Sequence, residues 1–498
     1  MRVARSVLVC LVLCLSVFLS FGCGSGGGGG TPTTTTTVTT TTTVTSTSTV
    51  TSTTAAGSTS TTSTTTTTLK VSAPTFGTAS GSYEASAVSV TISCATAGSS
   101  IYYTTNGSNP TTSSTPYTGA FDLNSSKALK AIAVKSGMAN SDISSAWYDV
   151  YWWQPVGTLD NTVEALAMTD TGVIAGGHFT GYAAQWTGSA WSPPPSAFNG
   201  PVNVIVVNPA DSRIYVGGNF TTPGNYIVSS DGPTFYDLAS GVNAEVLSLA
   251  VDGSGNVYTG GKFTTASGVS SARVVMWNRS GTSWEALQGG TTNTVYALAY
   301  DTDDDLLYAG GTFSKAGDVT ANKIAVWKAA VATPTWEAIP NDLMYNGASG
   351  PVMALLVHSG GDLLVGGTFN QVGVGGSPVT AHNIAYYDPG GGTWNGFGTG
   401  VDNTVRVIAQ SYTKSYGGDN ILIGGDFIQA NGTDAAYRIA RSSLGGGQTW
   451  TQLYNGVAGS ATVKAICIDQ TNGDIYIGGS FTEVGGVACS NVAKFGKK

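Results

Sequence analysis

The tetrapeptide Gly-Gly-x-Phe occurs seven times in this 498-residue chain, and it constrains the fold more than any other feature. The phenylalanines stand at positions 179, 220, 263, 313, 369, 427 and 481, so that successive copies are 41 to 58 residues apart. A period of that size indicates a repeat architecture, in which each repeat is one small unit that buries its apolar faces against its neighbours. Features that recur with the repeat are therefore interpreted first as scaffold.

Each repeat shows the same order of short segments. In the fourth repeat an apolar run, Val295–Tyr300, precedes a polar turn and then the segment Leu306–Phe313, which carries the Gly-Gly-x-Phe phrase. A longer loop leads to Lys323–Trp327, and a short turn leads to Thr335–Ile339. Four strands of this length are typical of one blade of a β-propeller. The first two strands are apolar on both faces, as expected for sheets covered by neighbouring blades.

The two ends of the repeat region indicate how the ring closes. The last repeat stops after Val492–Phe495, its third strand, and so lacks a fourth strand with a phrase such as Trp284–Leu287. A matching phrase, Trp153–Val156, stands just before the first repeat. The sequence therefore predicts a seven-bladed β-propeller over 151–498, closed by an N-terminal strand at 151–157 that leaves no open sheet edge.

The segment 70–150 predicts a separate small domain. Its strand-like runs include Val88–Cys94, Ile101–Thr104 and Ala128–Val134, and Asn106-Gly107 marks a tight turn between two of them. This pattern favours a β-sandwich. The fold class is thus all-β, with a small β-sandwich followed by the propeller.

Particular residues of this segment resemble a known family. The run Ile101–Thr111, Tyr117 and the run Leu129–Gly137 are similar to the C-terminal β-sandwich of chitobiases and β-hexosaminidases, a module also associated with family-29 glycoside hydrolases. Asn106 departs from that pattern, because the family shows Asp before the glycine of this turn. The resemblance implies a carbohydrate context without catalytic residues, since the module is an accessory in those enzymes.

The repeats resemble bacterial and fungal families of Gly-Gly-x-Phe propellers, including the delta-60 type and cell-surface polarity-marker proteins. Ile324–Trp327 and Ile384–Tyr387 match their third-strand phrase. Kelch propellers also carry a double glycine after the second strand, although the phenylalanine here fits them less well. These resemblances support the fold and say little about function.

The N-terminus resembles the export signal of a bacterial lipoprotein. Arg2 and Arg5 precede the apolar run Val7–Phe21, which is short for a membrane span. We expect a signal peptide at 1–22 and lipidation of Cys23, although Ser20 stands where lipoproteins prefer leucine; the alternative is ordinary cleavage and secretion. Residues 23–69, rich in Thr and Ser, would form a disordered tether, which places the protein at the outer membrane or cell surface.

Charge and cysteine content limit the classes of partner and metal site that we expect. The formal charge is −8 and no basic patch is present, so nucleic-acid binding is not expected. No Cys-x-x-Cys pair or Cys/His cluster indicates a zinc site. Cys467 and Cys489 fall in one repeat and are a candidate disulfide in an oxidising compartment, although a whole strand is expected between them.

Motifs for chemistry are sparse. The turn Asp301–Asp305 has the oxygen-rich character of a calcium loop, but equivalent turns elsewhere favour a structural role, so that no cofactor is predicted and calcium is the alternative. The turn Ser443–Trp450 resembles the Asp-box of sialidases but carries Gly445 where the aspartate belongs, and no arginine cluster accompanies it. His178, His358 and His382 are scattered across the repeats. No catalytic residues are predicted.

A ligand site is expected on the propeller face that carries the loops from fourth to first strand and from second to third strand, because these loops vary most. The candidate ligand-binding residues in these loops are Asp160, Asn161, Asn243, Asn293, Asp402 and Asn403. The alternative is that an Asx residue before the first strand serves only the chemistry of the turn.

These features together predict a monomeric, surface-anchored bacterial lipoprotein with a non-catalytic binding or adhesion role. Its expected partner is polysaccharide or a cell-envelope component. The alternatives are a carbohydrate lyase or hydrolase acting on the propeller, and a protein-interaction scaffold in the envelope.

Overall fold

The computed structural model describes residues 69–498 except 195, 233, 330–332, 340–345, 374–377, 413–419 and 443–448. The expected signal peptide, Cys23, nearly all of the tether and most of the Asp-box-like turn lie outside the described residues. Residues Lys70–Lys498 form one compact unit, and every regular element in its described part is a β-strand. The all-β prediction is confirmed.

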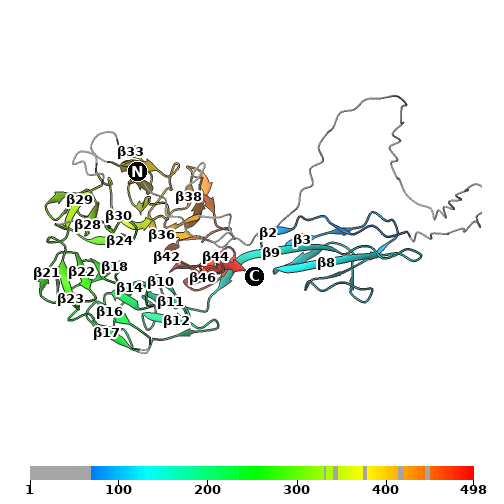
Figure 1. Ribbon diagram of the computed structural model, residues 1–498, viewed down its shortest axis with the longest axis horizontal. Helices are drawn as coiled ribbons and strands as arrows, with labels where there is room; N and C mark the ends of the chain where they lie inside the picture. The colour runs from blue at the N-terminus through cyan, green and yellow to red at the C-terminus, as the bar shows by residue number, and fades with distance from the viewer. Residues whose placement is uncertain are drawn as a thin grey trace, which may run out of the picture. The chain divides into compact units, whose positions relative to one another are not determined.

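Six of the repeats each form a separate four-stranded antiparallel sheet, in which neighbouring strands follow chain order (Figure 1). The first three sheets are β10 (Val163–Thr169), β11 (Gly172–Gly177), β12 (Ala183–Trp186) and β13 (Trp191–Ser192); β14 (Val202–Val207), β15 (Ile214–Gly218), β16 (Ile227–Ser230) and β17 (Phe235–Asp237); and β18 (Val246–Val251), β19 (Val257–Gly261), β22 (Val274–Asn278) and β23 (Ser283–Ala286). The next three are β24 (Val295–Asp301), β25 (Leu306–Gly311), β28 (Ile324–Lys328) and β29 (Thr335–Ala338); β30 (Val352–Val357), β31 (Leu363–Gly367), β34 (Ile384–Asp388) and β35 (Thr393–Gly396); and β36 (Val405–Ser411), β37 (Asn420–Gly425), β40 (Ile439–Ser442) and β41 (Thr451–Gln452).

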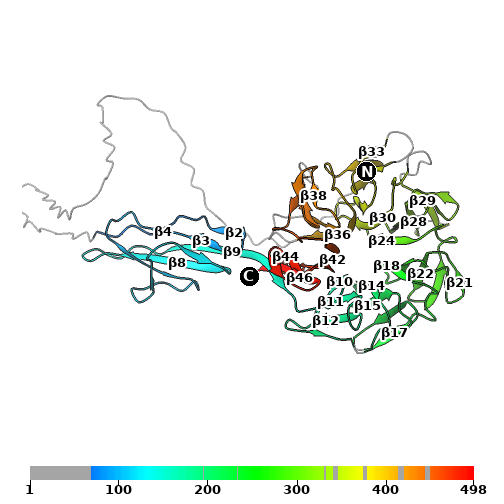
Figure 2. The same cartoon turned by 180° about the vertical axis from the view of Figure 1, so that it is seen from behind.

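The sheets are arranged as a β-propeller. The first strands β10, β14, β18, β24, β30 and β36 each contact the next around the centre, and β42 (Thr462–Ile468) contacts both β36 and β10. Both views show these strands facing the middle of the ring (Figure 1, Figure 2). Among the described residues, no strand of one of these six sheets pairs with a strand of the next, and the sheets pack against one another through side chains.

The strands of the seventh Gly-Gly-x-Phe repeat belong to a larger sheet. β42, β43 (Ile475–Ser480) and β46 (Val492–Lys497) pair in order, and β46 then pairs antiparallel with β9 (Ser144–Pro155), Phe495 opposite Trp153. β9 continues to β8 (Lys127–Val134), β5 (Ser100–Thr104) and β6 (Thr115–Pro116), while β2 (Gly81–Glu84) pairs with it in parallel. The structure therefore has six separate four-stranded sheets rather than seven, because the strand expected at 151–157 is the second half of a longer strand.

The side chains of β9 change their buried face along the strand, so that β9 contributes to two hydrophobic cores. Tyr148 and Val150 are fully buried in a cluster with β3 (Val88–Val90) and β7 (Phe121–Leu123), whereas Trp153 is fully buried in a cluster with β42 and β43. Val150 and the adjacent Tyr151 are both buried, which breaks the strict alternation of a strand with one covered face. The remaining pair, β1 (Thr75–Phe76) and β4 (Ile92–Ser93), forms its own two-stranded sheet.

Each glycine of the repeated phrase occupies a place that a larger side chain would overfill. A Cβ on the first glycine would lie 2.3 to 2.7 Å from a valine of the next first strand, and the series ends with Gly478 against Val163 of the first repeat. A Cβ on the second glycine would lie 1.9 to 2.2 Å from the carbonyl oxygen of the residue before the buried valine of that repeat's own first strand. The seven phenylalanines are at most 5% exposed. The scaffold interpretation of the phrase therefore has a physical basis in close packing.

Tryptophans of the fourth strands link neighbouring repeats. The indole Nε1–H of Trp284 donates to the carbonyl of Leu238 at 3.0 Å, and that of Trp336 donates to Leu287 at 2.8 Å. Trp153 on β9 makes the same kind of bond, to the carbonyl of Tyr454 at 2.9 Å. β9 therefore supplies the contact that fourth strands supply elsewhere in the ring.

Cys467 and Cys489 are free thiols, so the candidate disulfide is not formed. Their side chains belong to different hydrophobic clusters, Cys467 beside the first repeat and Cys489 beside Trp153. Burial raises the pKa of the Cys467 thiol to about 12 and that of Cys489 to about 11. The thiolate, which is the reactive species, is therefore scarce at both positions near neutral pH.

We expect a thiol reagent at neutral pH to label Cys94, which is partly exposed, and to spare Cys467 and Cys489 until the protein unfolds. Mass spectrometry of peptides from the native and urea-unfolded Lys70–Lys498 unit measures this directly. Labelling of Cys467 at the rate of Cys94 in the native protein would contradict the burial described above.

Candidate functional site

Seven side chains, one from each first strand, line a cavity of about 210 Å³ at the centre of the ring. Each is the residue after a buried valine, and each lies at a β-bulge, where the pairing with the second strand skips one position. A bulge redirects a side chain without ending the strand. The lining residues, here called the channel residues, are Glu164, Asn203, Leu247, Tyr296, Met353, Arg406 and Lys464.

The channel residues fall into two arcs. Arg406, Lys464, Glu164 and Asn203 follow one another around the ring and form a polar arc. Leu247, Tyr296 and Met353 complete the ring as an apolar arc. A ligand in the channel would therefore meet an aromatic and aliphatic wall on one side and hydrogen-bonding groups on the other.

Ion pairs hold the polar channel residues in place, directly for Glu164 and Lys464 and through Glu245 for Asn203, whose amide donates to Glu245 Oε1 at 3.0 Å. Lys464 Nζ lies 2.5 Å from Glu164 Oε1, and His178 Nε2 lies 3.4 Å from the same oxygen. Lys262 Nζ lies 2.7 Å from Glu245 Oε2, and this hydrogen bond raises the pKa of the lysine. The groups are preorganised because each charge has a partner.

Arg406 and Asp426 form the most tightly connected of these pairs. Arg406 Nη2 donates to Asp426 Oδ2 at 2.7 Å, Nε donates to both carboxylate oxygens, and Thr462 Oγ1 donates to Oδ1 at 2.8 Å. Burial alone would raise the pKa of the Asp426 carboxyl, but these hydrogen bonds outweigh burial and hold the pKa below its ordinary value. Asp426 therefore stays ionised at neutral pH.

Three of the predicted ligand-binding residues hold loops in place. Asp160 accepts the backbone N–H of Thr180 at 2.8 Å and its hydroxyl at 2.5 Å, which lowers the pKa of the aspartate. Asn243 and Asp402 accept backbone N–H groups at the same place in their own repeats. The alternative of turn chemistry accounts for these contacts.

The other three predicted residues are placed similarly. Asn161, Asn293 and Asn403 each accept the backbone N–H of the threonine that follows, at 2.7 to 2.8 Å. The six predicted residues come from four repeats, and within the described part of the chain Asp160 and Asn161 line a cavity of about 420 Å³ with His178, Thr180 and Tyr182. The channel residues were missed, because in sequence each is one ordinary position inside an apolar strand.

The turns considered for calcium are hydrogen-bonded internally. Asp301 Oδ1 accepts the backbone N–H groups of Asp303 and Asp304, and Asp252 Oδ1 accepts those of Ser254 and Asn256. Within the described ranges, no group of three or more His, Cys, Asp or Glu side chains is placed to hold a metal ion.

The described arginines that form ion pairs here are engaged by carboxylates of the protein itself. Arg213 and Arg279 both lie against Asp211, Arg213 also pairs with Asp231, and Arg441 pairs with Glu84. This arrangement offers no support for sialidase chemistry.

Comparison with known proteins bears on the N-terminal part of the described chain. Residues 78–145 match the chitobiase/beta-hexosaminidase C-terminal domain. This chitobiase C-terminal domain includes β2 to β8 and ends just inside β9. Its identification confirms the family resemblance expected from the residues around Tyr102 and Tyr103.

No curated protein sequence matches the chain. The solved WD40 β-propeller domain of Doa1 is 15% identical, with a TM-score of 0.47, and the alignment covers 70% of this chain and 97% of that one. No helix long and apolar enough to cross a membrane occurs among the residues that the structure describes.

Proposed function

We propose that this protein is a non-catalytic, surface-displayed bacterial binding protein whose ligand is a polysaccharide. The observation that carries the proposal is the chitobiase C-terminal domain at 78–145, a domain named for enzymes that act on carbohydrates. β9 pairs with β8 of that domain on one side and with β46 of the propeller on the other, so the two parts form one continuous sheet and are proposed to serve the same class of ligand. Lipidation at Cys23 and the tether of residues 23–69 would hold the unit at the outer membrane or cell surface as a monomer.

The channel supplies a fitting site. A sugar ring has an apolar face of C–H groups and an edge of hydroxyl groups that donate and accept hydrogen bonds. Tyr296 offers an aromatic surface, while Glu164 and Lys464 across the ring offer fixed acceptors and donors. The volume, about 210 Å³, suits a small group such as one end of a chain rather than a drug-sized molecule.

We further infer that β42, β43, β46 and β9 serve as a seventh blade and that the segment 70–150 is a two-layered sandwich. The first inference is supported by the contact of Gly478 with Val163 and by the Trp153 bond to Tyr454, which continue the pattern of the six separate sheets. The second is supported by the cluster that joins Val88 and Val90 of β3 to Leu129 of β8 and Tyr148 of β9.

The test is binding of the Lys70–Lys498 unit to a panel of chitin, cellulose, peptidoglycan and capsular polysaccharides, measured by pull-down and calorimetry. We expect at least one uncharged polysaccharide to bind and Tyr296→Ala to weaken it about tenfold. Tyr236→Ala is the matched control, since Tyr236 is 44% exposed on the outer strand β17. The proposal fails if no polysaccharide binds or if both variants bind like the unaltered protein.

The same samples separate the alternatives. Release of new reducing or unsaturated ends from a bound polymer would favour the lyase or hydrolase. Absence of glycan binding, together with envelope proteins crosslinked to the unit on whole cells, would favour the interaction scaffold.

A further inference from the structure

The loop between second and third strands differs between the first two repeats and the others. In the third to seventh repeats it contains a two-stranded hairpin. These hairpins are β20 (Thr265–Ala266) with β21 (Val269–Ser270), β26 (Lys315–Ala316) with β27 (Val319–Thr320), β32 (Gln371–Val372) with β33 (Val379–Thr380), β38 (Gln429–Ala430) with β39 (Asp434–Ala435), and β44 (Glu483–Val484) with β45 (Val487–Ala488). The corresponding loops of the first two repeats, 178–182 and 219–226, are fully described and contain no strand.

The hairpins cover the face on which they lie. Ala266, Ala316, Val372 and Ala430 are at most 1% exposed, and each forms a β-bridge with a residue that follows the preceding sheet. Where such a hairpin is lacking, over the first repeat, the surface is hollowed instead.

Two cavities over the first repeat lie side by side and share part of their lining. The cavity lined by Asn161, His178 and Tyr182 shares Asp160, Phe179 and Thr180 with a second cavity of about 300 Å³, which extends outward to Trp191. We call the two together the first-repeat groove. Its inner end adjoins the channel, because His178 lines the groove and contacts Glu164, a channel residue, at 3.4 Å.

The lining of the first-repeat groove suits an uncharged, hydroxyl-rich chain. Tyr182 and Trp191 are partly exposed and supply aromatic surface, and Asn161, Thr180 and His178 supply donors and acceptors. The only carboxylate in the lining is Asp160, which already accepts two hydrogen bonds from Thr180. The net charge of −8 disfavours an anionic polymer.

We propose that the first-repeat groove binds the continuing sugar units of an uncharged glycan whose end occupies the channel. The site is thus extended, with one subsite at the channel residues and further subsites leading outward past Tyr182. This inference rests on the proposed polysaccharide function. It adds that the glycan chain runs outward from the channel over the first repeat, and that affinity depends on the length of the chain.

The second repeat offers a matched control for Tyr182. Tyr182 and Tyr226 occupy equivalent positions, with φ of 61° and 66°, and each donates its backbone N–H to the phenylalanine of its own repeat at 2.8 Å. Glycine adopts such positive φ freely, so that Tyr182→Gly and Tyr226→Gly remove the ring without straining the backbone. Only Tyr182 lines the groove.

The test uses calorimetry to measure the affinity of the Lys70–Lys498 unit for two series of oligosaccharides of increasing length, one of N-acetylglucosamine and one of glucose. We expect affinity to rise about tenfold from the disaccharide to longer oligomers, and Tyr182→Gly to abolish that rise while disaccharide affinity is kept. Tyr226→Gly should keep both. Thermal unfolding of the two variants checks that they are equally folded.

The result of this test distinguishes failure of the groove proposal from failure of the proposed function. Oligomer binding without any dependence on length, or a length dependence that survives in Tyr182→Gly, overturns the groove and leaves the channel site standing. No binding of any oligomer, with no polysaccharide retained in the panel either, overturns the proposed function and the groove together.

Discussion

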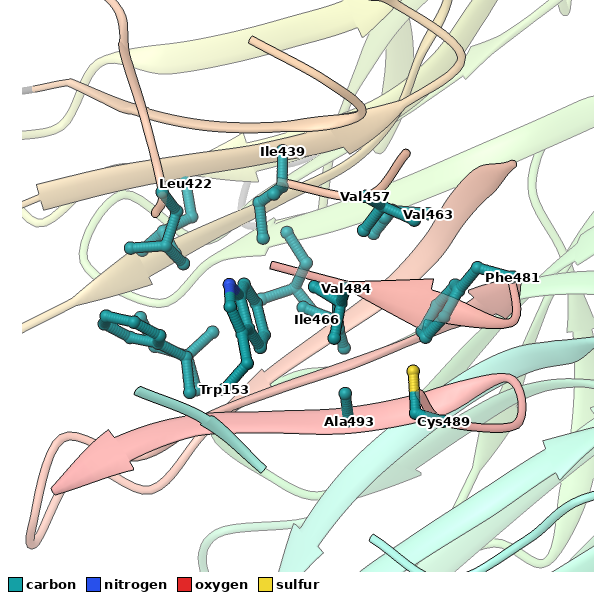
Figure 3. Close-up of a cluster of buried hydrophobic side chains, with 14 of the residues drawn as sticks. Trp153, Leu422, Ile439, Val457, Val463, Ile466, Phe481, Val484, Cys489 and Ala493 are labelled. Atoms are coloured by element: carbon teal, nitrogen blue, oxygen red, sulfur yellow. The ribbon is translucent and has the colours of Figure 1, made fainter. Parts of the chain in front are cut away.

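Replacing Trp153 by alanine is expected to lower the free energy of unfolding of the Lys70–Lys498 unit by about 3–5 kcal/mol, the usual cost of removing a buried aromatic side chain. Trp153 is fully buried, its ring centroid lies 5.1 Å from that of Phe495, and its indole bonds to the carbonyl of Tyr454. Figure 3 shows the indole among side chains of the sixth and seventh repeats, between Leu422 and Val484. The side chain therefore joins β9 to strands more than two hundred residues later in the sequence.

Trp147 provides the control on the same strand. It is 50% exposed, so Trp147→Ala should change stability by no more than about 0.5 kcal/mol. Trp153→Phe keeps most of the apolar contact and loses the hydrogen bond, and should fall between the two. Urea unfolding followed by tryptophan fluorescence and circular dichroism measures all three. Equal effects of Trp153→Ala and Trp147→Ala would mean that β9 does not close the ring.

Closure by an early strand has a physical consequence for the whole unit. Without β9, the pairing edge of β46 from Ala493 to Lys497 would be open, and an open edge invites pairing with other chains. We therefore expect the stability of the propeller to depend on the 70–150 segment, because β9 contributes residues to the cores of both.

The order of strands within each repeat could be predicted from the sequence, because the same close contacts between strands recur in every repeat. The glycine pairs mark places where backbone and valine side chains approach closely, and the Trp-x-x-apolar phrase marks strands whose indole reaches the neighbouring repeat. For that reason Trp153–Val156 identified the partner of β46 across more than three hundred residues of sequence.

The sequence did not predict that β9 is one continuous strand. Nothing in the residues around Val150 and Tyr151 distinguishes two strands from one strand that changes its buried face, because both alternatives place two adjacent apolar residues at the point of change. The expected domain boundary at 150/151 consequently falls inside an unbroken strand.

The channel was hidden for a different reason. Glu164 and Lys464 are three hundred residues apart, and each follows a valine in a strand that otherwise looks buried. Only the ring order makes them neighbours, and only the bulge turns them toward the centre. The predicted Asx residues stand in variable loops, and all six accept backbone N–H groups of those loops.

The second glycine of each repeated phrase should be the least replaceable small residue in the propeller. We expect Gly311→Ala to destabilise the Lys70–Lys498 unit by about 3 kcal/mol, at the upper end of the range for overpacked sites. The new Cβ would lie 2.0 Å from the carbonyl oxygen of Thr294 and 3.1 Å from the Cα of Val295. Both are backbone atoms of the adjacent strand, so a rotamer change cannot relieve the clash, and β24 and β25 must separate.

Gly253→Ala is the control, because that glycine lies in a turn with nothing within 4 Å of an added Cβ and without a positive φ. It should be neutral or slightly stabilising, since alanine restricts the unfolded chain. Thermal and urea unfolding of both variants tests the contrast. If Gly311→Ala matched the control, the double glycine would owe its recurrence to something other than the approach of strand to strand, and the packing account of all seven copies would have to be abandoned.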